Sequence, residues 1–317
     1  MWMTETQLAG HGAEAVSDYF RNSQEGQLCT ADGLRLHYRL FLPAKAQTML
    51  VLANGRTETV GKYQELIYEL GQLGIAVAAM DHRGQGLSER QSADQQLGHV
   101  LAFDDYVTDL NHFVSTVVLP LGFSRHWLLA HSMGSCISAL YLARYHHPFS
   151  KVVMTSPMFG IATKPFPGQV ARALARVQSW LDQRRGQPRY LPTTGPYQPA
   201  PFADNGLTHS PLRYQRAVQY LQEQPQSRLG GPSAQWLNAA FQAMQQALAV
   251  AKDIRVPVLV IVAEADPIVT RKAQQQFAQA LPDGRLILID GGWHELLLES
   301  DDKRQQTLDA LLAFFSH

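Results

Sequence analysis

Residues 126–138, HWLLAHSMGSCIS, decide the fold of this chain. An apolar run leads directly to Ser132, with Ala130 and Gly134 two positions to either side. The spacing nearly matches Gly-x-Ser-x-Gly, the turn between a strand and a helix that exposes a nucleophilic serine. Small flanking residues let the strand and the helix pack around such a turn, and alanine adds only one methyl group. The stretch predicts a nucleophile at Ser132. The alternative is an ordinary helix N-cap, a position that serine occupies equally often.

Short apolar runs alternate with helical patterns on both sides of this stretch. A hairpin is expected around Asp32-Gly33. Further extended runs follow at residues 48–53, 75–81, 126–131, 151–157, 256–266 and 285–290, with helices near 63–73, 103–118, 271–281 and 301–315 and one starting near 133. This order predicts an α/β fold with a mostly parallel central sheet, helices on both faces, and binding groups at the carboxyl ends of the strands.

The alternation stops between residues 157 and 250, where glutamine, proline and amphipathic helical segments prevail. We interpret 157–250 as an inserted, mainly helical cap that divides the core into residues 1–156 and 251–317. The cap has nine Lys and Arg against three Asp and Glu, so it carries +6, and the neutral chain leaves −6 for the remainder. This asymmetry predicts an anionic partner for the cap, with an ordinary solvated basic face as the alternative.

A catalytic serine needs a base to accept its proton and an acid to orient that base. In a fold of this order both follow the serine, each just beyond a strand, the acid first. Asp266 ends the run VPVLVIVAEAD, and His294 follows the run RLILID. Glu264 is an alternative acid, and His294 is one of twelve histidines. The order nevertheless predicts that Ser132, Asp266 and His294 form a catalytic triad.

Acyl transfer also needs backbone donors for the developing oxyanion. We expect them to be the amides of Met133, directly after the nucleophile, and of Arg56, in a loop where Gly55 permits close approach of the substrate. Met158 and Phe159 are expected either to line an acyl pocket or to pack in the core.

Several classes of function are not supported by the sequence. Charged residues make up 17% of the chain with no net charge, which argues against nucleic-acid binding. The loops GRTETVGKY and DHRGQGLSER lack the spacing of nucleotide-binding motifs, and the histidines and two cysteines show no metal-ligand spacing. We therefore expect no cofactor and no metal. Without an export signal or an apolar span, a cytoplasmic protein with at most peripheral contact with the inner face of the membrane is expected.

These segments together resemble a known family. NGRTETVGKY, DHRGQGLSER, AHSMGS, SPMFGI, LTHSPLRY, GGPSAQW, AEAD and WHELLLE are similar to segments of cap-bearing serine hydrolases of the α/β-hydrolase superfamily, in the branch of monoacylglycerol lipases and bacterial lysophospholipases. The resemblance covers nearly the whole chain and implies an α/β-hydrolase fold. It assigns Ser132, Asp266 and His294 as triad and Arg56 and Met133 as oxyanion donors. The family usually has His-Gly where this chain has Asn54-Gly55.

The resemblance implies hydrolysis of lysophospholipids through an acyl-serine intermediate, with monoacylglycerols or simple esters as alternative substrates. An alternative hypothesis is that the chain is not an enzyme but a catalytically silent lipid-binding or membrane-associated module with the same fold. One cap segment bears on both ideas, because apolar residues recur at helical spacing beside arginines: Val170, Leu174, Val177 and Leu181. Such a helix either rests on anionic lipid or buries its apolar stripe against the core.

Overall fold

The computed structural model describes residues 2–163, 168–192 and 194–316, and these contain one eight-stranded sheet. The order across the sheet is β1-β2-β4-β3-β5-β6-β7-β8. The first two pairings are antiparallel, and all pairings from β4 to β8 are parallel. The strands are β1 (Gln24–Cys29), β2 (Arg35–Phe41), β3 (Thr48–Ala53), β4 (Ile75–Met80), β5 (Arg125–His131), β6 (Phe149–Thr155), β7 (Val258–Ala263) and β8 (Gly284–Ile289). The predicted fold class is confirmed.

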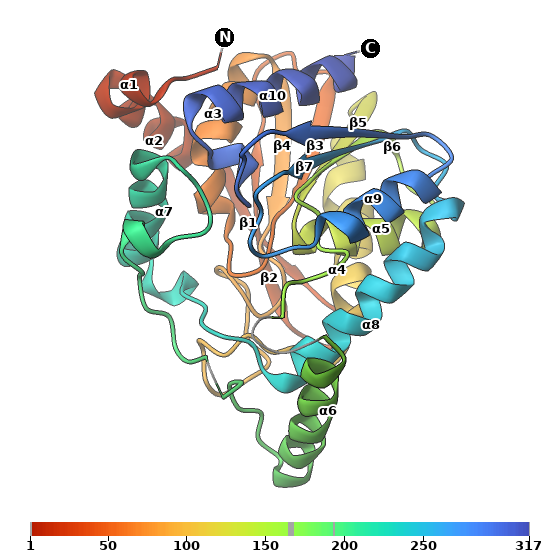
Figure 1. The fold of residues 1–317 in the computed structure, drawn as a ribbon. Helices are drawn as coiled ribbons and strands as arrows, with labels where there is room; N and C mark the ends of the chain where they lie inside the picture. The colour runs from red at the N-terminus through yellow and green to blue at the C-terminus, as the bar shows by residue number, and fades with distance from the viewer. Residues whose placement is uncertain (1, 164–167, 193, 317) are drawn as a thin grey trace.

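Helices cover both faces of the sheet, as Figure 1 shows. Because successive side chains of a strand point to opposite faces, β3 contributes to two separate cores. Met49, Val51 and Ala53 pack with α4 (Asp104–Phe113), α5 (Met133–Arg144), α8 (Ala234–Val250) and α9 (Arg271–Ala280). Leu50 and Leu52 pack with α2 (Ala13–Arg21), α3 (Gln64–Gln72) and α10 (Asp301–Ser316). The central strands are therefore buried from both sides, and their carboxyl ends are held rigidly.

The N-terminal segment, for which the sequence predicted no helix, is helical in the structure. It forms α1 (Glu5–Gln7) and α2, separated by a short π-helical stretch. Val16 and Phe20 of α2 are buried one turn apart, and Phe20 packs in the core cluster beneath α3 and α10. Two apolar positions among many polar ones gave too weak a pattern to predict this helix.

The inserted segment contributes α6 (Gly168–Arg185) and α7 (Pro211–Glu223) before the chain enters α8. In Figure 1, α6 projects away from the body, whereas α7 lies beside it. Ala240, Met244 and Ala247 of α8 are buried in the same cluster as α5 and α9. We therefore propose that the insertion ends near Ser233, whose hydroxyl accepts a hydrogen bond from Trp236 N at 3.1 Å, rather than at residue 250.

The apolar stripe of α6 faces outward. Val170, Leu174 and Val177 are 44%, 52% and 58% exposed, and the buried face of the helix is instead made by Ala175, Ser179 and Asp182. The expectation that the stripe packs against the core is thus wrong for these three residues, because the small and polar side of the helix fits against α8. Lys164 of the predicted basic cap lies outside the described residues. Among those described, no helix is long and apolar enough to cross a membrane.

Candidate active site

Three strand ends bring the predicted catalytic residues together. Ser132 lies between β5 and α5, Asp266 follows β7, and His294 follows β8. These strands run parallel, so the loops after them all open at the same edge of the sheet. Residues distant in sequence therefore meet in one place.

The backbone at Ser132 has the strained geometry of a nucleophile turn. Its φ of 49° and ψ of −115° lie in a region that residues with a side chain rarely adopt. Ser132 does occupy the N-cap position of α5, but its side chain makes no capping hydrogen bond. A Cβ at Gly134 would lie 2.2 Å from the Ala53 carbonyl oxygen, so glycine is needed where α5 approaches the end of β3. Ala130 is fully buried in this packing, with its methyl group accommodated.

A chain of hydrogen bonds links the three side chains. His294 Nε2 lies 3.0 Å from Ser132 Oγ, and His294 Nδ1 lies 2.7 Å from Asp266 Oδ2. The other oxygen of Asp266 accepts the amides of Ile268 and Val269 at 2.8 and 3.0 Å, which fixes the carboxylate. The alternative acid, Glu264, is more exposed and accepts the Gly291 amide at 3.0 Å instead. This arrangement can pass a proton from serine to histidine while a carboxylate holds the imidazole.

Electrostatics favour a proton on His294. Burial by itself lowers the pKa of His294, but the hydrogen bond and charge of Asp266, together with Glu295 and Glu58, outweigh burial and raise it above 6.5. The neighbouring His131 has the opposite balance, because burial lowers its pKa to about 3 and keeps it neutral. Only one of these two adjacent histidines is therefore suited to exchange a proton near neutral pH.

A buried charged cluster next to the triad was not foreseen from the sequence. Lys62 Nζ donates to Glu58 Oε1 and to Glu295 Oε1, each at 2.5 Å, and ties the loop after β3 to the residue following His294. Glu58 also accepts hydrogen bonds from the Gly55 amide and the Tyr63 hydroxyl. The spacing of Glu58 and Lys62 was a local signal, but nothing in the sequence pointed to Glu295 as the second partner.

The same cluster also contains three potential metal ligands. Among the described residues, this is the only group of His, Cys, Asp or Glu side chains that is compact enough to hold a metal ion. Glu58, His131 and Glu295 have ligand atoms within 4.8 Å of one another. The ammonium group of Lys62 already bridges the two carboxylates, however, and would repel a cation. We therefore assign the cluster to positioning rather than to metal binding.

The predicted oxyanion loop is held in place by the glycine-rich loop after β4. Gln85 Nε2 donates to the carbonyl oxygens of Gly55 and Glu58 at 2.7 and 3.1 Å, and a nitrogen of His82 lies 3.2 Å from the Asn54 carbonyl. DHRGQGLSER thus has a structural role here. The first amides of a helix have no partner within it, and the Met133 amide lies at this position in α5. The oxyanion roles of Met133 and Arg56 remain predictions.

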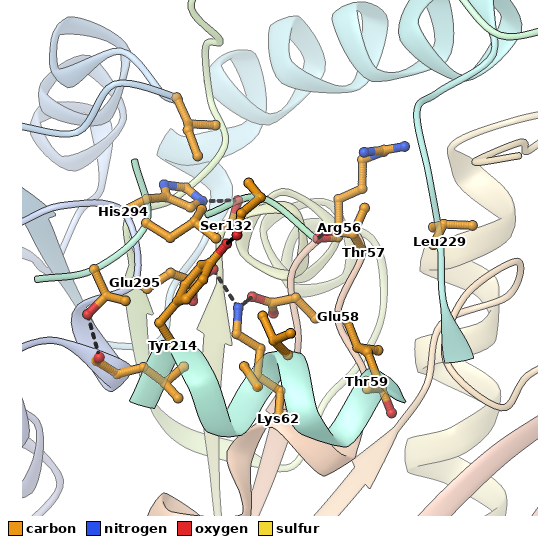
Figure 2. Close-up of a pocket in the computed structure, with 18 of the residues that line it drawn as sticks. Arg56, Thr57, Glu58, Thr59, Lys62, Ser132, Tyr214, Leu229, His294 and Glu295 are labelled. Atoms are coloured by element: carbon orange, nitrogen blue, oxygen red, sulfur yellow. Dashed lines mark hydrogen bonds and ion pairs between the residues drawn. The ribbon is translucent and has the colours of Figure 1, made fainter. Parts of the chain in front are cut away.

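A cavity of about 610 Å³ opens over Ser132 and His294. Figure 2 shows Glu58, Lys62 and Glu295 on one side of Ser132 and Tyr214 of α7 beside it. Most of the remaining lining is apolar and includes Met158, Ile161, Leu207, Ala217, Val218, Leu221, Leu229, Trp236, Val269 and Leu298. A long apolar chain can therefore lie against a reactive serine.

The two residues expected near an acyl pocket separate in the structure. Met158 lines the cavity, and its amide donates to the Ser132 carbonyl at 3.0 Å. Phe159 does not line it and instead stacks on Phe277 of α9, with ring centroids 3.8 Å apart. A substrate contact for Phe159 is corrected to a core role, because its side chain turns toward the sheet-facing side of α9. Gly55 supports the oxyanion loop and is not itself part of the cavity lining.

Comparison with models of protein families assigns the chain to a family. A family model described as "Serine aminopeptidase, S33" matches residues 44–301, which include the nucleophile turn and the loops after β7 and β8. The chain belongs to this family. Its α/β-hydrolase fold agrees with the sheet order and with the position of Ser132 between β5 and α5.

Curated proteins of similar sequence also match over most or nearly all of the chain. Lysophospholipase L2 of Escherichia coli is 35% identical, covering 99% of this chain and 94% of its own. A probable lysophospholipase L2 of Haemophilus influenzae is 33% identical, covering 89% of each chain. Among solved structures, a monoglyceride lipase from Saccharomyces cerevisiae superposes with a TM-score of 0.71 at 19% identity, covering 91% of this chain and 92% of its own. That last similarity concerns the fold alone.

Proposed function

We propose that this protein is a lysophospholipase, a serine hydrolase that cleaves the acyl ester of lysophospholipids. The observation that carries the proposal is the chain Asp266, His294 and Ser132, hydrogen-bonded at 2.7 and 3.0 Å and opening into a largely apolar cavity. The full-length similarity to proteins named lysophospholipase L2 supports this substrate class.

In the proposed reaction, Ser132 Oγ attacks the ester carbonyl while His294 Nε2 accepts the serine proton. The Met133 and Arg56 amides stabilise the negative charge that develops on the carbonyl oxygen. His294 then donates its proton to the departing glycerol oxygen, which leaves an acyl-serine and the free glycerophospho head group. Water, deprotonated by His294, releases the fatty acid, and Asp266 holds the imidazole throughout.

A covalent probe and a substrate panel test the proposal. A fluorophosphonate should label the wild-type protein and fail to label Ser132→Ala, because the probe mimics the acyl transfer. Labelling that persists in Ser132→Ala would remove the assigned nucleophile. Hydrolysis rates for lysophosphatidylcholine, a monoacylglycerol with the same acyl chain and a short nitrophenyl ester then rank the substrates. A lack of hydrolysis of every ester, with stoichiometric lipid retained on the protein, would favour a silent lipid-binding module.

Monoacylglycerol is the second candidate substrate. Relatives named monoglyceride lipase match about half of this chain at 34% and 32% identity. A higher kcat/KM for monoacylglycerol than for the matched lysophospholipid would favour this alternative.

We further propose that α6 brings the protein into peripheral contact with an anionic membrane. If the protein is cytoplasmic, this membrane surface is the inner face of the cell membrane. Leu174 and Val177 are about half exposed, and so is Trp180, whose ring lies 3.9 Å below the Arg184 guanidinium. Exposed arginines on the same helix supply charge that anionic lipids attract: Arg176, Arg184 and Arg185. An apolar face flanked by cations is typical of a helix that lies at a lipid surface.

Vesicle co-sedimentation tests this contact. Binding should be stronger to anionic than to neutral vesicles and should weaken as salt rises, because surface charges are screened. Leu174→Ser with Val177→Ser should reduce binding, whereas Leu119→Ser, an exposed apolar residue away from the inserted segment, serves as the control. Equal binding to neutral and anionic vesicles would contradict the electrostatic part of the proposal.

A further inference from the structure

The half-buried side chain of Arg56 differs from the three buried arginines among the described residues. Arg83 lies 2.6 Å from Asp109, Arg213 lies 2.9 Å from Glu65, and Arg304 lies 2.5 Å from Glu69. No carboxylate of the described residues lies within ion-pair distance of Arg56. A desolvated cation is costly unless an anion compensates it. Arg56 thus carries a largely desolvated positive charge that no carboxylate of the described residues offsets.

The surroundings of the Arg56 guanidinium leave donors unused. Nη2 donates to the Gly230 carbonyl at 2.8 Å, and the guanidinium lies 4.9 Å from the centre of the Trp236 ring. Nε is buried with no hydrogen-bond partner among the described residues. Burial, with no nearby carboxylate to offset it, lowers the pKa of Arg56 to about 10, which still leaves the group charged at neutral pH.

This unpaired cation lines the same cavity as the nucleophile. Arg56, Ser132 and His294 all contribute to the cavity wall. Figure 2 shows the Arg56 side chain pointing away from the Glu58 carboxylate, which turns instead toward Lys62. The nearby acidic groups, Glu58 and Glu295, are thus engaged with Lys62 rather than with Arg56.

We propose that the Arg56 guanidinium binds the phosphodiester of the substrate and so selects lysophospholipids over uncharged monoacylglycerols. The inference rests on the proposed function and deepens it. An arginine forms paired hydrogen bonds with phosphate oxygens, and a phosphodiester supplies the anion that the site lacks. If the Arg56 amide contacts the reacting carbonyl oxygen, its side chain spans about as many bonds as separate that carbonyl carbon from the phosphorus of a lysophospholipid. Arg56 would then bind the ester carbonyl through its amide and the phosphate of the head group through its side chain.

Gly98 provides room for this guanidinium. A Cβ on Gly98 would lie 2.5 Å from Arg56 Nη2, so alanine there would displace the guanidinium without changing the Arg56 residue itself. This gives a second, independent variant with which to test the proposal.

The experiment compares kcat/KM for lysophosphatidylcholine with kcat/KM for a monoacylglycerol of the same acyl chain. In Arg56→Gln the ratio of the two should fall roughly 10- to 100-fold, the effect expected for a lost hydrogen bond to a charged group. Arg56→Lys should keep most of the preference, because the charge remains. Gly98→Ala should lower the ratio in the same direction. Arg90→Gln is the matched control, since Arg90 donates to backbone carbonyls including that of Gln226 and lies outside the cavity lining.

An unchanged ratio in Arg56→Gln would overturn the proposal. Equal effects of Gln and Lys at residue 56 would also overturn it, because they would point to a structural tie to Gly230 rather than to charge. Binding to the Ser132→Ala protein separates this inference from the proposed function, because it needs no hydrolysis. Calorimetry should detect glycerophosphocholine but not glycerol, and Arg56→Gln in that background should abolish the signal. Inorganic phosphate binding as tightly as glycerophosphocholine would assign the site to a free anion and reject the head-group assignment.

Discussion

The cavity has two walls that are built in different ways. The core wall includes Ser132, His294 and the loops after β3, β5, β6, β7 and β8, and backbone amides and carboxylates fix its polar groups. The cap wall consists of Tyr214, Ala217, Val218, Leu221 and Leu229 and offers mainly apolar surface. This difference indicates that the core wall supplies the chemistry and the cap wall supplies the fit to the acyl chain. Changes in the two walls should therefore affect different kinetic constants.

The largest effect on activity is expected from replacing the catalytic acid of the core wall. Asp266→Asn should lower kcat by about 10⁴-fold, because an amide no longer holds the imidazole in the productive tautomer. Steady-state kinetics measure the loss, and an unchanged melting temperature shows that the fold persists. Glu264→Gln, two residues away and not in contact with His294, is the matched control and should retain activity. Comparable losses in both variants would contradict the assignment of Asp266.

The second largest effect is expected on stability, from breaking the contact that joins the two walls. Arg213 of α7 is 1% exposed and pairs with Glu65 and Asp301 at 2.9 Å, so it joins the cap wall to the core. Arg213→Met should lower the free energy of unfolding by about 3 kcal/mol, because the buried Glu65 carboxylate loses its nearest cation and keeps only Arg304 at 3.3 Å. Denaturant unfolding measures this, and Arg216→Met on the same helix should change stability by no more than about 0.5 kcal/mol. Equal effects would show that α7 is not anchored by this pair.

A smaller change is expected from filling the cap wall. Ala217→Trp narrows the apolar part of the cavity, so kcat/KM for a long-chain ester should fall about tenfold relative to a short nitrophenyl ester. Gln219→Trp, on the exposed side of α7, is the control and should leave the ratio unchanged. A uniform loss on both esters would place Ala217 among groups that serve the chemistry and would weaken the contrast between the walls.

The smallest effect is a displacement of the acid limb of the pH profile. His294 must be neutral to accept the serine proton, and its pKa is raised above 6.5, so activity is lost as pH falls through that raised value. With an uncharged ester, the acid limb of kcat/KM should therefore have its midpoint above 6.5. The residual activity of Asp266→Asn should show a limb at lower pH, because the charge that raises the pKa is gone. A wild-type midpoint below 6.5 would contradict this electrostatic account of the core wall.

The sequence by itself determined the order of the strands and of the core helices after β2, the nucleophile turn at Ser132, and the places where Asp266 and His294 follow their strands. These features depend on local patterns, since periodicity and turn residues act over a few positions.

Only the tertiary structure decided which apolar faces are covered and which charges are paired. Val177 has the same helical spacing whether it meets the core or solvent, and Phe159 follows a strand whether it lines the cavity or stacks on Phe277. Likewise, nothing near Arg56 in the sequence distinguishes it from an arginine with a carboxylate partner. Burial and charge pairing depend on distances between residues far apart along the chain, and folding alone sets those distances.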